Sequence, residues 1–175
     1  MKKALIIVDY QNDFVCGSLG FPGAELLDAV IAQKIEEYRS AGGEIIFTLD
    51  THVPNYLETQ EGKHLPVPHC IKGTPGHDLF GKTASLRLPE DKVFEKPTFP
   101  SADLLNYLKN REYASVELCG LVSSICVVSN AVIVKAALPE VPVFIDAKAT
   151  AAGDVKLHEE ALDILENLQI QVINR

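Results

Sequence analysis

Short apolar runs typical of buried strands alternate along this chain with longer segments of helical character. The strand-like runs are residues 4–8, 44–49, 92–95, 114–119, 141–145 and 170–173. Helices are expected between them, at residues 24–41, 101–110, 125–138 and 155–168. This alternation predicts an α/β fold, in which helices cover both faces of a central parallel sheet and form three layers, α-β-α.

Length and composition exclude several classes of protein. At 175 residues and 47% hydrophobic content, the chain is expected to form a single globular domain, residues 1–175. The net charge of −8 argues against nucleic acid or an anionic membrane surface as a partner. No apolar run has the length of a membrane span, and the N-terminal run lacks a signal-peptide pattern. We therefore expect a cytoplasmic protein with free cysteines.

Cys126 lies where a thiol can serve as a nucleophile. It follows the expected strand at 114–119 and the turn residue Gly120, and it falls in the first turn of the helix expected at 125–138. Free N–H groups and the positive field at a helix N-terminus lower the pKa of a thiol and stabilise a nearby anion. The alternative is a small buried hydrophobic residue, because free cysteines are commonly buried.

Three charged residues come directly after expected strands: Asp9, Asp50 and Lys96. The carboxyl ends of parallel strands lie at one edge of the sheet, where ligands bind in such folds. Nucleophilic catalysis needs a base and a cation near the thiol, and Asp9 and Lys96 can supply them. Taken singly, each would more often be a turn residue or a solvated lysine.

The long segment 51–90, rich in Gly, Pro and His, is expected to be a functional loop. Residues i and i+2 of an extended chain point the same way, so Asp50 and His52 can share one ion. The candidate ligands are Asp50, His52, His69 and, from between the histidines, Glu61 or Glu58. One Asp, two His and a Glu suit Zn²⁺, Mn²⁺ or Fe²⁺, whereas solvated loop histidines are the alternative.

Together these motifs resemble those of the isochorismatase-like cysteine hydrolases, and within them the nicotinamidase/pyrazinamidase branch. The matching stretches are residues 5–14, 50–52, 68–70, 73–76, 94–96 and 120–126. The resemblance spans nearly the whole chain and implies the Rossmann-like, isochorismatase-like form of the three-layer fold.

The resemblance assigns catalytic roles residue by residue. Cys126 matches the nucleophile, Asp9 the acid/base and Lys96 the catalytic lysine. The N–H groups of Val122 and Cys126 would hold an oxyanion, and a cis peptide bond is expected between Leu121 and Val122.

The resemblance also implies a metal site and a substrate site. The metal ligands would be Asp50, His52, His69 and Glu61. A single divalent ion is expected, Zn²⁺ by preference, with Mn²⁺ or Fe²⁺ as alternatives. Phe14, Leu19 and Pro66 are expected to line the substrate pocket. Ser124 replaces the usual Asp of the nucleophile loop. Pro66 replaces the aromatic residue usual in nicotinamidases, and because proline is smaller we expect a wider pocket.

The favoured interpretation is a cysteine amidohydrolase that cleaves a small carboxamide, nicotinamide or pyrazinamide, to the acid and ammonia, as in NAD salvage. A small-molecule amide is then the partner, and a homo-oligomer is expected. One alternative is a related hydrolase of an N-carbamoyl or ureido compound. Another is a non-catalytic binding protein with the same fold.

Overall fold

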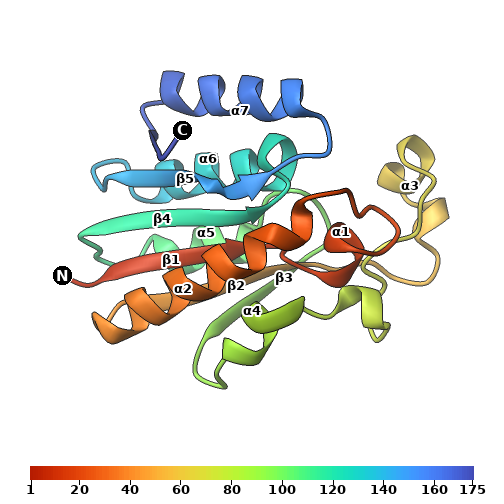
Figure 1. Cartoon of the computed structure of the whole chain (residues 1–175), viewed down its shortest axis with the longest axis horizontal. Helices are drawn as coiled ribbons and strands as arrows, with labels where there is room; N and C mark the ends of the chain where they lie inside the picture. Colours follow the sequence, from red (N-terminus) through yellow and green to blue (C-terminus); the bar gives the residue numbers. More distant parts are fainter.

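The computed structural model describes residues 1–175 (Figure 1). The strands are β1 (Lys3–Val8), β2 (Glu44–Asp50), β3 (Lys92–Lys96), β4 (Ser115–Leu121), β5 (Val143–Ala151) and β6 (Gln171–Ile173). The α-helices are α1 (Asn12–Val15), α2 (Leu27–Ser40), α3 (Gln60–His64), α4 (Gly81–Leu86), α5 (Ala102–Leu108), α6 (Val128–Ala137) and α7 (Val155–Asn167). Shorter helical segments are η1 (Ala24–Leu26), η2 (Tyr56–Glu58), η3 (Pro75–His77) and the π-helix η4 (Ser123–Val127).

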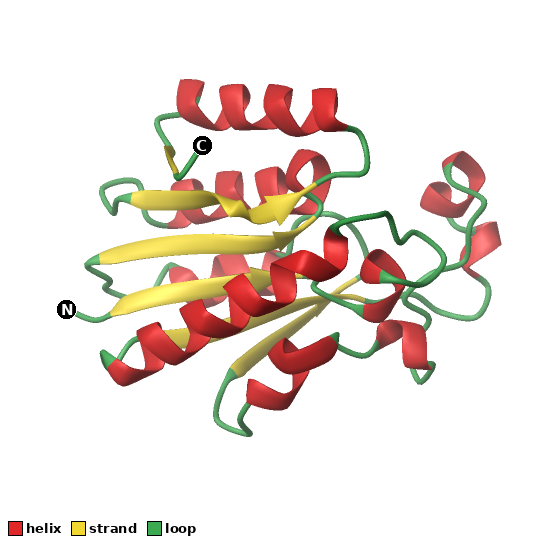
Figure 2. Ribbon diagram, viewed as in Figure 1, coloured by secondary structure: helices red, strands yellow, loops and turns green.

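The six strands form one parallel sheet in the order β3-β2-β1-β4-β5-β6, as the alternation predicted. Helices lie on both of its faces (Figure 2). One hydrophobic core cluster lies under α5, α6 and α7, and a second lies under α2. The three-layer α/β prediction is confirmed. In this strand order β1 and β4 lie side by side at the topological switch point, where such sheets bind ligands.

Local sequence explains where the helices begin. Asp154 caps α7 by accepting hydrogen bonds from the backbone of Lys156 and Leu157, and Ser101 caps α5 by accepting one from Leu104. None of the helices is both long and apolar enough to cross a membrane.

Two predictions of local structure were wrong. β5 does not end before Asp146 but continues to Ala151, with a register shift against β4 after Leu118. Asp146 is therefore inside the strand, where it pairs with Lys34 of α2. The segment 51–90, expected to be a loop with a short helix near residues 78–83, contains four short segments: η2, α3, η3 and α4. Each segment is too short to show a hydrophobic period in the sequence.

Candidate functional site

The carboxyl ends of the neighbouring strands β1, β2 and β3 bring the charged residues together. All strands point toward the side of the molecule where α1 and α3 lie (Figure 1). Asp9 directly follows β1, while Asp50 and Lys96 are the last residues of β2 and β3 and lie opposite each other in the parallel register. The register of the sheet places these side chains at one edge, as the sequence predicted.

The ammonium group of Lys96 lies at the centre of the site and is 1% exposed. Its Nζ lies 2.6 Å from Asp9 Oδ2 and 3.4 Å from Asp50 Oδ1. It also donates to Cys126 Sγ at 3.6 Å and to the carbonyl of Thr98 at 3.1 Å. Burial acts to lower the pKa of Lys96, but the charges of Asp9, Cys126 and Asp50 outweigh it and raise that pKa. Lys96 therefore remains a cation.

Asp9 is fully buried, and its backbone adopts a φ of 46°, a region that Asp tolerates better than most residues. The hydroxyl of Thr48 donates to Asp9 Oδ1 at 2.6 Å, while Oδ2 faces Lys96. Burial raises the pKa of Asp9 above its ordinary value, although the charge of Lys96 opposes that shift. A carboxyl group with a raised pKa can both take up and release a proton.

Cys126 lies in η4, directly beyond the end of β4, and is 5% exposed. The backbone that leads to Cys126 requires glycine at position 120, because φ there is +107° and a Cβ would lie 2.1 Å from the Val8 carbonyl oxygen. Burial raises the pKa of the Cys126 thiol well above its ordinary value, and the charge of Asp9 adds to this against Lys96. The lowering of the Cys126 pKa that the sequence predicted is therefore wrong, because burial of the sulfur has the largest effect on this pKa.

The turn that leads from β4 to Cys126 contains a backbone N–H group without a partner in the chain. The peptide bond between Leu121 and Val122 is cis, as the family resemblance implied. Val122 N–H donates no hydrogen bond within the chain, and Val122 accepts from the N–H groups of Ile125 and Val127. A free N–H at this turn is the kind of donor that an oxyanion needs.

Four side chains meet next to Lys96, with one ligand atom from each within 4.8 Å of all the others: Asp50, His52, Glu61 and His69. Asp50 Oδ2 lies 3.0 Å from His52 Nε2 and 3.3 Å from His69 Nε2, and Glu61 Oε1 lies 3.6 Å from each of these nitrogens. Metal–ligand bonds of ~2.0–2.1 Å in a tetrahedral site place ligand atoms about 3.3 Å apart. The donor set therefore fits a divalent ion such as Zn²⁺.

Neighbouring groups orient these ligands. His69 Nδ1 lies 2.8 Å from the carbonyl oxygen of Val67, an arrangement in which Nδ1–H donates and Nε2 keeps its lone pair. Gln11 accepts from Asp50 N–H and donates to the Asp50 carbonyl oxygen. Gln11 lies in the matching stretch 5–14, but its contact with Asp50 was not predicted from the sequence.

Glu61, not Glu58, joins the cluster. Thr59 caps α3 by accepting from Gly62 N–H, and this places Glu61 in the first turn, facing the histidines. The carboxylate of Glu58 instead accepts a hydrogen bond from Asn55.

A cavity of about 700 Å³ opens beside the metal-ligand cluster. Its apolar lining comes from Val53, Leu65, Phe99 and Ile125, which the sequence reasoning did not select. The predicted wall residues do not line it. Phe14 is buried with its ring centroid 5.6 Å from that of His69, Leu19 packs against the second core cluster, and Pro66 is exposed next to Leu65.

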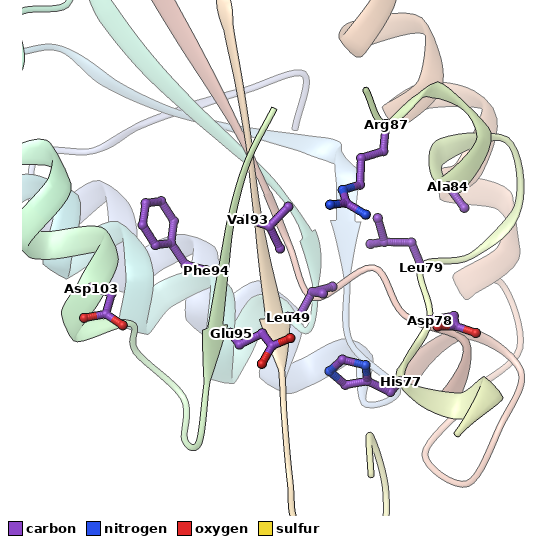
Figure 3. Close-up of a pocket in the computed structure, with 10 residues that line it drawn as sticks. All are labelled: Leu49, His77, Asp78, Leu79, Ala84, Arg87, Val93, Phe94, Glu95 and Asp103. Carbon is purple, nitrogen blue, oxygen red and sulfur yellow. The ribbon is translucent and has the colours of Figure 1, made fainter. Parts of the chain in front are cut away.

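A second cleft, of about 670 Å³, lies beside β3 at the edge of the sheet (Figure 3). Leu49, Val93 and Arg87 line it, together with His77 and Glu95. None of the sequence-predicted site residues lines this cleft. The predicted chemistry is confined to the carboxyl end of the sheet.

Comparison with known proteins gives concordant matches. The model of the Isochorismatase domain family matches residues 3–175. The isochorismatase family protein PncA of Bacillus subtilis is 34% identical over 144 residues, which cover 75% of this chain and 78% of that protein. The crystal structure of nicotinamidase/pyrazinamidase PncA from Bacillus subtilis has a TM-score of 0.86 and 30% identity, covering 98% of this chain and 99% of that one. That of pyrazinamidase from Pyrococcus horikoshii in complex with zinc has a TM-score of 0.85 and 24% identity, covering 100% of both chains.

Proposed function

Because the chain belongs to the isochorismatase family, we propose that it is a cysteine amidohydrolase acting on nicotinamide or pyrazinamide. The observation that carries this proposal is the contact of one buried lysine with both a carboxylate and a thiol: Lys96 with Asp9 and Cys126. The similarity to a nicotinamidase/pyrazinamidase over the full chain supports the substrate class.

The reaction begins with a neutral thiol, since burial holds the pKa of Cys126 high. Asp9 takes the thiol proton as Cys126 Sγ attacks the amide carbon, and the N–H groups of Val122 and Cys126 hold the oxyanion. Asp9 then gives the proton to the leaving nitrogen, and ammonia departs from a thioester. Finally Asp9 takes a proton from water as the water attacks the thioester, the acid leaves, and Cys126 recovers its proton.

Lys96 keeps these charges in place. While Asp9 is ionised, the ammonium group balances the carboxylate at 2.6 Å, and as sulfur gains charge the same group lies 3.6 Å from it. Because Lys96 contacts both groups, it stabilises the negative charge on Asp9 before the proton transfer and on Cys126 after it. Because the site is buried, these interactions are stronger than they would be in water.

We propose that Asp50, His52, Glu61 and His69 hold one divalent ion, Zn²⁺ by preference. When bound, the ion supplies a Lewis acid that anchors a ring nitrogen of the substrate or a water molecule. Burial acts to raise the pKa of Asp50, but hydrogen bonds from His52 and His69 and the charge of Lys96 together lower it, so the carboxylate is ionised.

Replacing both His52 and His69 by alanine is expected to remove the ion, because only two carboxylates would remain and Zn²⁺ favours nitrogen ligands. Elemental analysis of protein purified without chelator should find about one ion per chain in the unaltered protein and almost none in the double variant. The matched control is His64→Ala, an exposed histidine on α3. Undiminished metal content in the double variant would place the ion elsewhere.

We propose that Phe99, Ile125 and Leu65 form the apolar walls of the substrate pocket, since they line the cavity next to the ligand cluster. Their side chains are 41%, 43% and 37% exposed, and a bound ring would cover part of this surface. Aromatic stacking on Phe99 adds about 0.5–1.5 kcal/mol to the burial of a flat ring. The sequence predicted one wall from Phe14 and Leu19 and the other from Pro66, but none of these residues lines this cavity.

The test of this function is a steady-state comparison of amide substrates by ammonia release. Nicotinamide and pyrazinamide are expected to be hydrolysed, and Phe99→Ala is expected to raise KM by about threefold to tenfold through lost stacking. Pro66→Ala, the exposed neighbour of Leu65, serves as the control variant. Efficient turnover of an N-carbamoyl or ureido compound without turnover of nicotinamide would overturn the substrate. No turnover of any amide would favour a binding protein.

We also propose that the protein acts in the cytoplasm as a homo-oligomer. All four cysteines are free, which a reducing compartment would maintain. Exposed Val132, Ile164 and Leu168 on and beside α6 and α7 provide apolar surface that a second copy could bury. Light scattering of the purified protein distinguishes an oligomer from a monomer.

A further inference from the structure

The side chain of Asn130 joins the two segments that carry the sulfur and the ammonium group. Asn130 lies in α6 and is fully buried, yet it touches none of the proposed reacting atoms. Its amide nitrogen donates to the Cys126 carbonyl oxygen at 2.8 Å and to the Phe99 carbonyl oxygen at 3.0 Å. Its amide oxygen accepts from Ser101 N–H at 3.1 Å. Every donor and acceptor of this side chain is used within the protein.

The first of these bonds fixes the turn that carries the nucleophile. Cys126 belongs to the π-helix η4, which changes into the α-helix α6 at Val128. Such π-turns are uncommon and interrupt the regular ladder of helical hydrogen bonds. The Asn130 side chain gives the Cys126 carbonyl oxygen a donor from the next turn of the helix, which fixes the backbone of Cys126 itself.

The other two bonds hold the segment that follows β3. Lys96 ends β3, and its ammonium group donates to the carbonyl of Thr98, two residues on. Asn130 binds the next residue, Phe99, and the start of α5 at Ser101. The Thr98 carbonyl, which accepts from the Lys96 ammonium group, is therefore one residue from Phe99, which Asn130 holds by a hydrogen bond.

We propose that Asn130 is a positioning residue that sets the separation between Cys126 Sγ and Lys96 Nζ. The inference rests on the proposed function, because it gives this separation a role in catalysis. Asparagine suits the position because one amide supplies two donors and an acceptor. The hydrogen bond from Asn130 to the Phe99 carbonyl oxygen also holds Phe99 at the wall of the cavity.

The experiment compares Asn130→Ala and Asn130→Ser with Val134→Ala, a control in the same helix. Val134 is fully buried in the first core cluster, so its truncation destabilises α6 without touching the site. A serine hydroxyl can still donate to the carbonyl four residues earlier but is too short to reach Phe99 and Ser101. Asn130→Ser thus keeps the bond to Cys126 and cuts the link to the β3 segment.

Both Asn130 variants are expected to lose about 10- to 100-fold in kcat, because a displacement of about 1 Å costs rates of that order. KM for nicotinamide should change less than kcat, and metal content should stay at that of the unaltered protein. Val134→Ala should lose thermal stability and keep kcat. Full kcat in Asn130→Ser, or an equal loss of kcat in Val134→Ala, would overturn the positioning role.

A second readout separates this inference from the substrate assignment. The rate at which iodoacetamide modifies Cys126, followed by peptide mass spectrometry, needs no substrate. It should change in both Asn130 variants and stay unaltered in Val134→Ala. If the unaltered protein does not hydrolyse nicotinamide while the Asn130 variants still change this rate, the substrate proposal fails and the positioning role stands. An unchanged rate in both variants would overturn the positioning role.

Discussion

Replacing Cys126 by alanine is expected to lower the turnover of nicotinamide by about 10⁶-fold, the order of loss when the nucleophile of a serine protease, which also forms an acyl intermediate, is removed. The physical reason is that no other group can form the covalent acyl intermediate at this position. The other buried cysteines cannot substitute, because Cys119, within β4, and Cys70 are both fully buried. Steady-state ammonia release measures the effect.

The matched control is Cys16→Ala, since Cys16 is an exposed free thiol outside the site. It should retain full activity, and Cys126→Ala should keep its metal, because sulfur is not among the proposed ligands. The nucleophile would have to be reassigned if the Cys126 variant kept activity within about tenfold of the unaltered protein. Inactivation by iodoacetamide that follows Cys16 instead of Cys126 would lead to the same conclusion.

Asp9→Asn is expected to lower kcat by about 10²- to 10⁴-fold, the usual contribution of a general acid–base group. Asparagine has the shape of aspartate and can still accept from the Thr48 hydroxyl, so the fold should persist. It cannot take the proton of Cys126, whose raised pKa keeps the thiol protonated. Circular dichroism and kcat, measured on the same sample, separate folding from catalysis. Near-normal kcat in a folded Asp9→Asn protein would remove Asp9 from the mechanism.

The strands, and the fact that they are buried, could be predicted from the sequence. Continuous apolar runs such as residues 4–8 bury both faces, and β1 is buried along five of its six residues. Because parallel strands end at one edge, the strand ends at Asp9, Asp50 and Lys96 were sufficient to predict a shared site. The position of Cys126 was predicted from Gly120, which the sequence placed in a turn after the strand and which the structure places near the end of β4.

Short-range patterns did not predict what depends on long-range contacts. The predicted loop 51–90 contains short helices that rely on packing, and α3 presents Glu61 to two histidines. The bonds of Gln11 to Asp50 join residues 39 positions apart, so no local pattern encodes them. The cavity lining from Phe99 and Ile125 likewise combines two distant segments.

The sequence by itself determined the fold class and predicted which side chains gather at the proposed site. Hydrophobic periodicity predicts which residues are buried, and the carboxyl ends of parallel strands predict where the charged residues meet. Only the tertiary structure decided the direction in which the pKa of the Cys126 thiol shifts. Helix position alone predicts a lowered pKa for Cys126, but the folded chain buries it beside Asp9 and raises that pKa. Desolvation and charge pairing depend on every group packed around an atom, and those neighbours come together only when the chain has folded.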